Sequence, residues 1–183
     1  MSNALPGHHA PTAGFEAPIE MLSACHHRIE RQCETLRRLV PHLARNGADD
    51  QARDAAAAVL RYFDTAAVQH HADEEEDLFP ALLESMAGSD PVCLRDLTGF
   101  LSSEHRQLAA RWRRLRAALR GIVAGETQML DGAEVEAFAS LYASHIEREE
   151  KELLPMAQRL LGDAELDAVG RAMRMRRGIE AVG

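Results

Sequence analysis

The sequence predicts an all-α protein, namely an antiparallel up-down four-helix bundle with a short extra C-terminal helix. Ala, Leu, Glu and Arg dominate the composition, whereas the strand-favouring residues Val, Ile and Thr are scarce. Four long stretches carry apolar residues at helical spacing, and short turn signals separate them. Because long helices joined by short connections pack in antiparallel order, this pattern predicts a bundle.

Caps and helix breakers define the expected boundaries of the helices. Pro41 should kink or fray the end of the first helix, and Pro80 should bend the second. Asp90, followed by a proline, should begin the third helix, and Asp131 and Asp163 should cap the fourth and the fifth. We therefore expect helices at about 18–45, 50–86, 91 to between 121 and 125, 131–161 and 163–177.

The chain of 183 residues has the length of one domain with a sizeable core. Residues 1–17 contain several Pro and Gly residues and are expected to form a flexible N-terminal arm. The bundle should occupy 18–161, and a short C-terminal helix and tail should occupy 162–183.

Charge and cysteine content limit the classes of function. The net charge of −8 argues against a nucleic-acid partner, since nucleic-acid-binding proteins normally carry a basic surface. We expect no membrane association, because no apolar stretch approaches the ~20 residues that span a bilayer. Three cysteines without C-x-x-C spacing fit a reducing compartment, so we expect a cytoplasmic protein. A homodimer is left open.

An internal repeat is the strongest signal in the sequence. It relates His70, Glu74 and Pro80 to His145, Glu149 and Pro155, with the same spacing in both halves. Upstream of these motifs, His26 and His105 also match each other, each with an apolar residue three positions later. The first two helices therefore look like a duplicate of the third and fourth.

The repeat places polar side chains on the apolar faces of the predicted helices. Positions i and i+4 project from the same face of a helix, so each histidine lies beside the glutamate four residues later. An unpaired carboxylate inside an apolar core is costly, and a cation would offset that cost. The candidate metal ligands are His26, His70, Glu74, His105, His145 and Glu149, with His71 and Glu104 as weaker candidates. The alternative is a buried hydrogen-bond network without metal.

These motifs resemble the hemerythrin-like domain, also called the HHE cation-binding domain. The resemblance covers about residues 18–161 and rests on the paired His-x-x-x-Glu motifs together with the two upstream histidines. It implies two iron ions, bridged by carboxylates and an oxide and held by the six candidate ligands; zinc or manganese can substitute for iron. A ferritin-like di-iron site fits less well, because those proteins use mostly glutamates with Glu-x-x-His spacing.

One position departs from the oxygen-carrying members of this family. They supply a fifth histidine on the third helix, one turn before the position of His105, where this sequence has Leu101. The six candidate ligands then leave two coordination positions open, which His71, Glu104 or water can fill. Tyr142, one turn before His145, is a candidate to hydrogen-bond a bound oxygen ligand, although core packing is its more usual role.

The resemblance implies a protein that binds or senses dioxygen, nitric oxide or iron. The alternative functions are an oxidoreductase that consumes peroxide or nitric oxide, and an iron donor for the repair of iron–sulfur clusters. The sequence contains no electron-donor domain, which favours a binding module, but it leaves open whether the protein is an enzyme.

Overall fold

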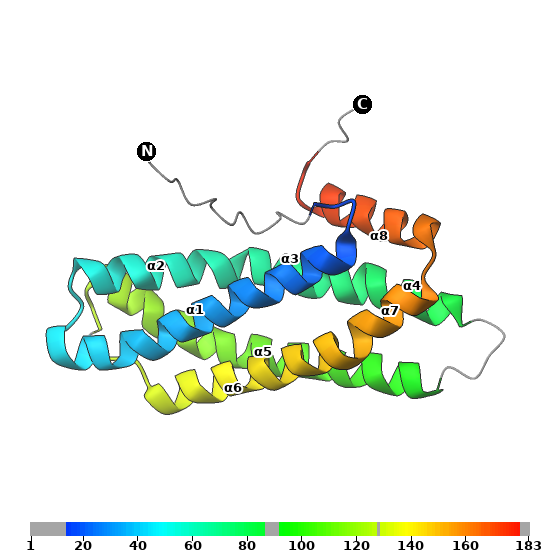
Figure 1. The fold of residues 1–183 in the computed structure, drawn as a ribbon. Helices are drawn as coiled ribbons and strands as arrows, with labels where there is room; N and C mark the ends of the chain where they lie inside the picture. The colour runs from blue at the N-terminus through cyan, green and yellow to red at the C-terminus, as the bar shows by residue number, and fades with distance from the viewer. Residues whose placement is uncertain (1–13, 87–91, 128, 180–183) are drawn as a thin grey trace, which may run out of the picture.

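The computed structural model describes residues 14–86, 92–127 and 129–179, and all regular structure in these ranges is helical (Figure 1). The prediction of an all-α chain is therefore confirmed. The α-helices are α1 (Pro18–Asn46), α2 (Asp50–Asp64), α3 (Ala66–Ala72), α4 (Phe79–Ser85), α5 (Val92–Ala124), α6 (Gly132–Arg148), α7 (Leu154–Leu160) and α8 (Asp163–Arg176). Two π-helical turns, η1 (Asp73–Leu78) and η2 (Glu149–Leu153), connect α3 to α4 and α6 to α7.

The helices form four long segments: α1, the series α2 to α4, α5, and the series α6 to α7. Figure 1 shows these segments side by side, with successive segments running in opposite directions. Helix α1 packs against α2 and α6, and α5 packs against the same two helices. Helix α8 lies across one end of the molecule, where it contacts α1 and η1.

The second segment is less continuous than the sequence predicts. It breaks at Thr65 and widens into η1, whereas the sequence placed one bend at Pro80. Pro80 instead lies in the first turn of α4, where its missing N–H leaves no helical hydrogen bond unmade. The turn before it is π-helical: the Phe79 N–H donates to the carbonyl of Glu74, five residues back.

The fourth segment repeats this local structure. The Leu154 N–H donates to the carbonyl of Glu149, and Pro155 follows in the first turn of α7. In each half of the chain, a π turn thus begins at or beside the glutamate of the His-x-x-x-Glu motif. A π turn rotates successive side chains differently from an α-helix, and such turns are frequent at functional sites.

The remaining boundaries lie close to the predictions. Helix α1 continues through Pro41 without the expected fraying and ends before Gly47, whose positive φ of 69° suits glycine. The cap at Asp131 is confirmed, because its side chain accepts hydrogen bonds from two backbone N–H groups of α6. The cap of α8 is Gly162, one residue before the predicted Asp163. The expected start of the third helix at Asp90 lies outside the described residues.

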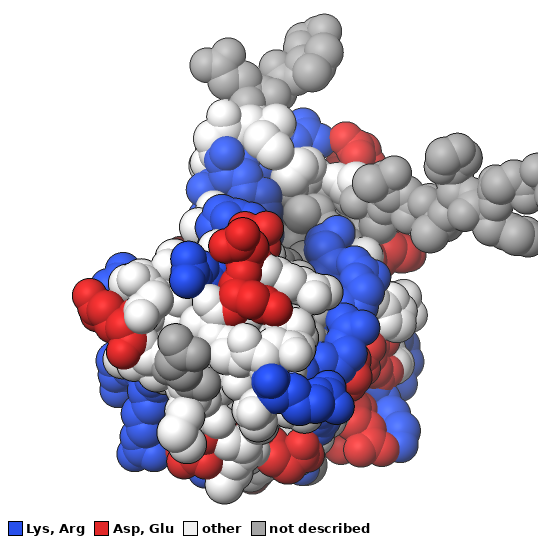
Figure 2. Space-filling view, turned by 90° about the vertical axis from the view of Figure 1, so that its left-hand side faces the viewer, with Lys and Arg blue, Asp and Glu red and all other residues white. Residues whose placement is uncertain are grey.

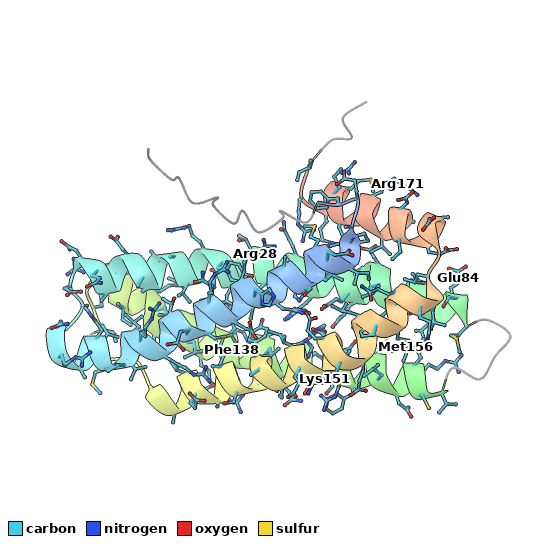
Figure 3. All side chains as sticks on the ribbon, viewed as in Figure 1. Arg28, Glu84, Phe138, Lys151, Met156 and Arg171 are labelled. Atoms are coloured by element: carbon cyan, nitrogen blue, oxygen red, sulfur yellow. The ribbon has the colours of Figure 1, made fainter. Side chains whose placement is uncertain are left out.

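Buried apolar side chains form two clusters, one on each side of a polar layer. The first lies between the longer arms of the helices and contains Leu36, Leu115 and Phe138. The second lies toward α4, α7 and α8 and contains Leu22 and Leu153. Figure 3 shows side chains filling the space between the helices, with Phe138 among them. The polar layer between the two clusters is therefore enclosed by apolar packing above and below.

The surface mixes charges of both signs. Figure 2 shows Lys and Arg side chains beside Asp and Glu side chains on the end of the molecule that lies at left in Figure 1. Within the described ranges, every helix is too short or too polar to cross a bilayer.

Candidate metal centre

The structure brings the six main candidate residues together in the polar layer. Each long segment contributes one histidine, from α1, α3, α5 and α6, and the two π turns contribute the glutamates. None of the six is more than 4% exposed. The residues that meet there are His26, His70, Glu74, His105, His145 and Glu149.

The two carboxylates lie between histidines from different helices. Glu149 lies 3.1 Å from His26 Nε2 and 3.0 Å from His145 Nε2. Glu74 lies 3.3 Å from His105 Nε2 and 3.4 Å from His70 Nε2. The Nε2 atoms of all four histidines thus face the two carboxylates.

Many of these inward atoms lack a hydrogen bond. Among the described residues, the buried side-chain atoms without a partner are His26 Nε2, both ring nitrogens of His70 and all four carboxylate oxygens of Glu74 and Glu149. Leaving even one buried polar atom unpaired costs about 1–3 kcal/mol. Seven such atoms in one place indicate a site that another group completes.

The donor atoms fall into two sets that share both glutamates. One set is His26, His70, Glu74 and Glu149, and the other is Glu74, His105, His145 and Glu149; within each set, one donor atom per residue lies within 4.8 Å of the others. Imidazole and carboxylate together are the ligands that iron, zinc and manganese accept. Each set therefore has a ligand composition that suits a metal ion.

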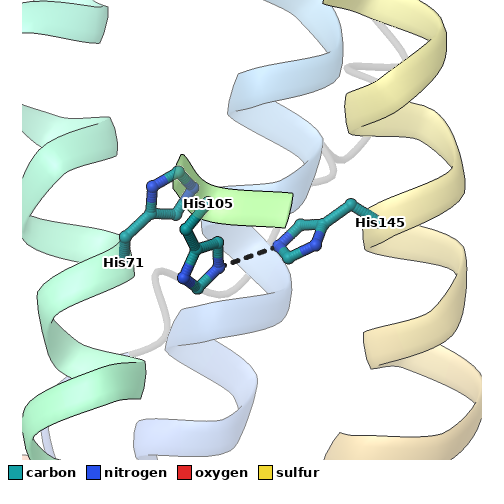
Figure 4. Close-up of side chains that lie close together, drawn as sticks. All are labelled: His71, His105 and His145. Atoms are coloured by element: carbon teal, nitrogen blue, oxygen red, sulfur yellow. Dashed lines mark hydrogen bonds between the residues drawn. The ribbon is translucent and has the colours of Figure 1, made fainter. Parts of the chain in front are cut away.

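His71 lies beside the two histidines of the second set and forms a separate group with them. Its ring stacks on that of His105, with centroids 4.0 Å apart, and the rings of His71, His105 and His145 lie together (Figure 4). His105 Nε2 and His145 Nε2 are 3.0 Å apart. His27, which follows His26 in the sequence, differs from His71: its side chain is 72% exposed and contacts Glu30. The structure thus supplies a fifth histidine from α3, although Leu101 occupies the place of the fifth histidine on α5.

Two further candidates lie beside the cluster rather than at its centre. The Glu104 carboxylate lies 3.0 Å from His145 Nδ1, the outward ring nitrogen, and also contacts Arg148. Glu104 belongs to neither set of inward donor atoms. The buried Tyr142 hydroxyl lies 3.4 Å from His71 Nε2.

Burial and the mutual proximity of these groups shift their pKa values. Burial alone would lower the pKa of His26, but the carboxylates of Glu149 and Glu74 raise it to about 11. Burial dominates at His70 and lowers its pKa to about 4. Burial also opposes ionisation of Glu74, yet the surrounding histidines, His70 first among them, hold the pKa of that carboxyl well below its usual range. The histidines lower the pKa of Glu149 as well and so favour the ionised form of both carboxyl groups.

The acidic run after His70 plays a larger structural part than the sequence suggested. The sequence predicts that Glu74 points inward and that the rest of the run is mostly a solvated helix face. Glu75 and Glu76 are indeed exposed, but two members of the run make contacts that this prediction does not include. Asp73 is fully buried against α8, and the Glu75 carboxylate lies 2.6 Å from His105 Nδ1. Glu150, in the matching place of the second half, lies 2.6 Å from His26 Nδ1. The internal repeat could have indicated these two contacts, because Glu75 and Glu150 each stand five residues after the histidine of a His-x-x-x-Glu motif.

Residues 17–157 match the model of the hemerythrin HHE cation-binding domain. The chain belongs to the hemerythrin HHE cation-binding family. The matched range contains all six inward residues and ends before α8. A protein of Haemophilus influenzae, described only as uncharacterized, is 32% identical over 168 residues, which cover 92% of this chain and 94% of that protein.

Membership of the HHE family and the geometry of the cluster agree. A cation-binding domain requires converging donor atoms that have no other partner, and the polar layer contains them. The buried His and Glu cluster of this hemerythrin-like chain is accordingly compatible with metal binding.

Proposed function

We propose that this protein is an antiparallel four-helix bundle that holds two iron ions at the buried cluster and binds or senses a small ligand there, such as dioxygen or nitric oxide. The observation that carries the proposal is the group of seven buried donor atoms without hydrogen-bond partners. In the described part of the chain, no Lys or Arg forms an ion pair with Glu74 or Glu149. A cation is therefore the group whose charge and coordination fit the cluster.

The two donor sets suggest how the ligands divide. His26 and His70 would hold one ion, His105 and His145 would hold the other, and the two glutamates would be shared. His71 is proposed as a third histidine for the second ion. If His71 is a ligand, the second ion would have one more protein ligand than the first, and a small ligand would then bind beside His26 and His70.

The chain's own contribution is to position the donors and limit the access of water. Four helices and two π turns fix the donor atoms, and the apolar clusters on both sides exclude bulk solvent. Iron bound there would exchange electrons with a small ligand at the open position. The three cysteines are free, which supports a cytoplasmic location.

Metal content and an optical spectrum test this proposal. The metal-free chain would be loaded anaerobically with ferrous iron, and we expect close to two irons per chain, with near-ultraviolet charge-transfer absorption after oxidation. His70→Ala and Glu149→Ala should lose iron and absorption. His27→Ala is the matched control, because that side chain is exposed and lies next to a proposed ligand. A wild-type chain that binds no iron would refute the proposal and leave a metal-free hydrogen-bond network.

The second candidate function is an oxidoreductase that consumes peroxide or nitric oxide. A cavity of about 300 Å³ is lined by His71 and Tyr142 together with Phe63, Leu108 and Trp112, so this space lies beside the group of His71, His105 and His145. An enzyme should consume peroxide or nitric oxide many times per site, whereas a binding protein should react once. Measuring peroxide and nitric oxide consumption by the iron-loaded chain decides between the two functions. The donation of iron to iron–sulfur clusters would appear as iron transfer to a cluster-depleted protein.

A further inference from the structure

Three of the four central histidines have a carboxylate at their outward ring nitrogen. His26 Nδ1 lies 2.6 Å from Glu150, and His105 Nδ1 lies 2.6 Å from Glu75. In the third pair, as described above, Glu104 lies 3.0 Å from the outward nitrogen of His145. A carboxylate at Nδ1 fixes the tautomer and the ring orientation, so that Nε2 points inward as a ligand, and it makes the imidazole a stronger donor.

Two of these contacts cross between the halves of the internal repeat. Glu75 follows the His70 motif in the first half and reaches His105 in the second. Glu150 follows the equivalent motif of the second half and reaches His26 in the first. Both glutamates lie in π turns, which carry the residue after the shared glutamate toward the neighbouring helix.

The third contact has no equivalent in the other half. His70 Nδ1 has no hydrogen-bond partner. Glu104 stands immediately before His105, and the matching place before His26 is Cys25, whose sulfur accepts a hydrogen bond from Arg28. The set of His105 and His145 therefore has a carboxylate at the outward nitrogen of both histidines. The set of His26 and His70 has a carboxylate at that of His26 only. The ring of His71, which stacks on His105, lies only beside the set of His105 and His145.

We propose that Glu75, Glu104 and Glu150 are positioning residues that orient the metal-binding histidines, and that their uneven distribution makes the two metal positions unequal. The ion between His26 and His70 is held more weakly and leaves first. This inference rests on the proposed function, because it needs two bound ions. Its physical basis is that loss of such a carboxylate typically lowers metal affinity by about 10–100-fold.

Competition with a ferrous-iron chelator tests the inference. The chain loaded anaerobically with ferrous iron is titrated with the chelator, and the wild type should lose its two irons in two separate steps. Glu150→Gln should weaken the first step about 10–100-fold, so that the two steps move further apart. Glu75→Gln and Glu104→Gln should weaken the second step by a similar factor, so that the two steps converge.

Neighbouring glutamates provide the controls. Glu76 is exposed and contacts Arg176, and Glu152 is exposed in the second π turn. Glu76→Gln and Glu152→Gln should leave both steps unchanged. A second readout follows the exchangeable, hyperfine-shifted N–H protons of the iron-bound histidines by NMR, and each positioning variant should shift one of them. Unchanged thermal unfolding of the metal-free variants would show that they still fold.

The outcomes separate the inference from the proposed function. Two irons released in one step from the wild type would overturn the inequality of the positions. Positioning variants that behave like Glu76→Gln in both readouts would overturn the role of the three carboxylates, while the iron site itself would stand. A wild-type chain that takes up no iron would refute the proposed function and this inference together.

Discussion

The contact between α8 and the first π turn provides a quantitative prediction. Asp73 precedes the central Glu74 and is completely buried. Its carboxylate accepts a hydrogen bond of 2.6 Å from Arg176 and two hydrogen bonds, of 2.6 and 3.1 Å, from Arg177. The two arginine side chains are only 18% and 14% exposed. Replacing Asp73 with Ala would leave both guanidinium groups largely buried and without this carboxylate as a hydrogen-bond partner.

The loss of stability depends on which other partners Arg176 and Arg177 keep when the Asp73 carboxylate is removed. Arg176 retains Asp77 at 2.7 Å and Glu76 at 2.8 Å, so its loss is partly compensated. Arg177 retains a hydrogen bond to a backbone carbonyl and a cation–π contact with Phe15, but it loses its carboxylate partner. Breaking a buried ion pair costs about 3–5 kcal/mol. Because the arginines keep some solvent access, we expect Asp73→Ala to lower the free energy of unfolding by about 3 kcal/mol.

Urea unfolding of the metal-free chain, followed by circular dichroism, measures this loss without a contribution from bound metal. Glu76→Ala is the matched control, because Glu76 contacts the same Arg176 but its side chain is 67% exposed. A surface ion pair contributes at most about 1 kcal/mol, so the control should be nearly as stable as the wild type. Equal losses in the two variants would refute the reasoning that burial of Asp73 decides its contribution.

Three further predictions concern the core, an exposed ion pair and the thiols. Phe138→Ala, which removes a fully buried ring, should lower the free energy of unfolding by about 3–5 kcal/mol in urea, and a loss below about 1 kcal/mol would contradict the packing described. Hydrogen bonds from Arg37 lower the pKa of Glu136 from 4.5 to about 2, so this pair stabilises the fold above pH 4.5 and its contribution is lost as the pH falls toward 2. Acid titration of unfolding should therefore be less steep in Glu136→Gln over that interval, and identical slopes would count against the pair. The exposed Cys93 should react first with a thiol reagent. Burial raises the pKa of Cys33 to about 12, so Cys33 should react only when the chain unfolds. Reaction of both thiols at the same rate in the native state would contradict this prediction.

The inward residues were predictable because they follow local periodicity. Spacing of i and i+4 places His70 beside Glu74 on any helix, and the apolar residues around them show that this face is buried. Helix ends at Gly47 and Asp131 were predictable for a similar reason, since caps act within one turn. Such signals need only a few neighbouring residues, and for this reason the sequence reveals them.

The π turns and the contacts between the halves were not predictable in this way. Glu75 looks like one member of an acidic helix face until η1 turns it toward His105 on another helix. The sequence gives His71 only as a weaker candidate, because its partners come from α5 and α6. Periodicity assumes a regular helix, and it fails where a π turn changes the rotation per residue.

The sequence by itself determined the helical class, the internal repeat and the identity of the six polar side chains on the apolar faces, because these depend on composition and spacing along the chain. The tertiary structure alone decided which donor atoms meet, which carboxylate lies behind each histidine, and that His70 lacks one. It also decided that α8 packs against the π turn through Asp73. These features depend on the relative position of helices that are far apart in sequence, and only packing of the whole chain sets that position.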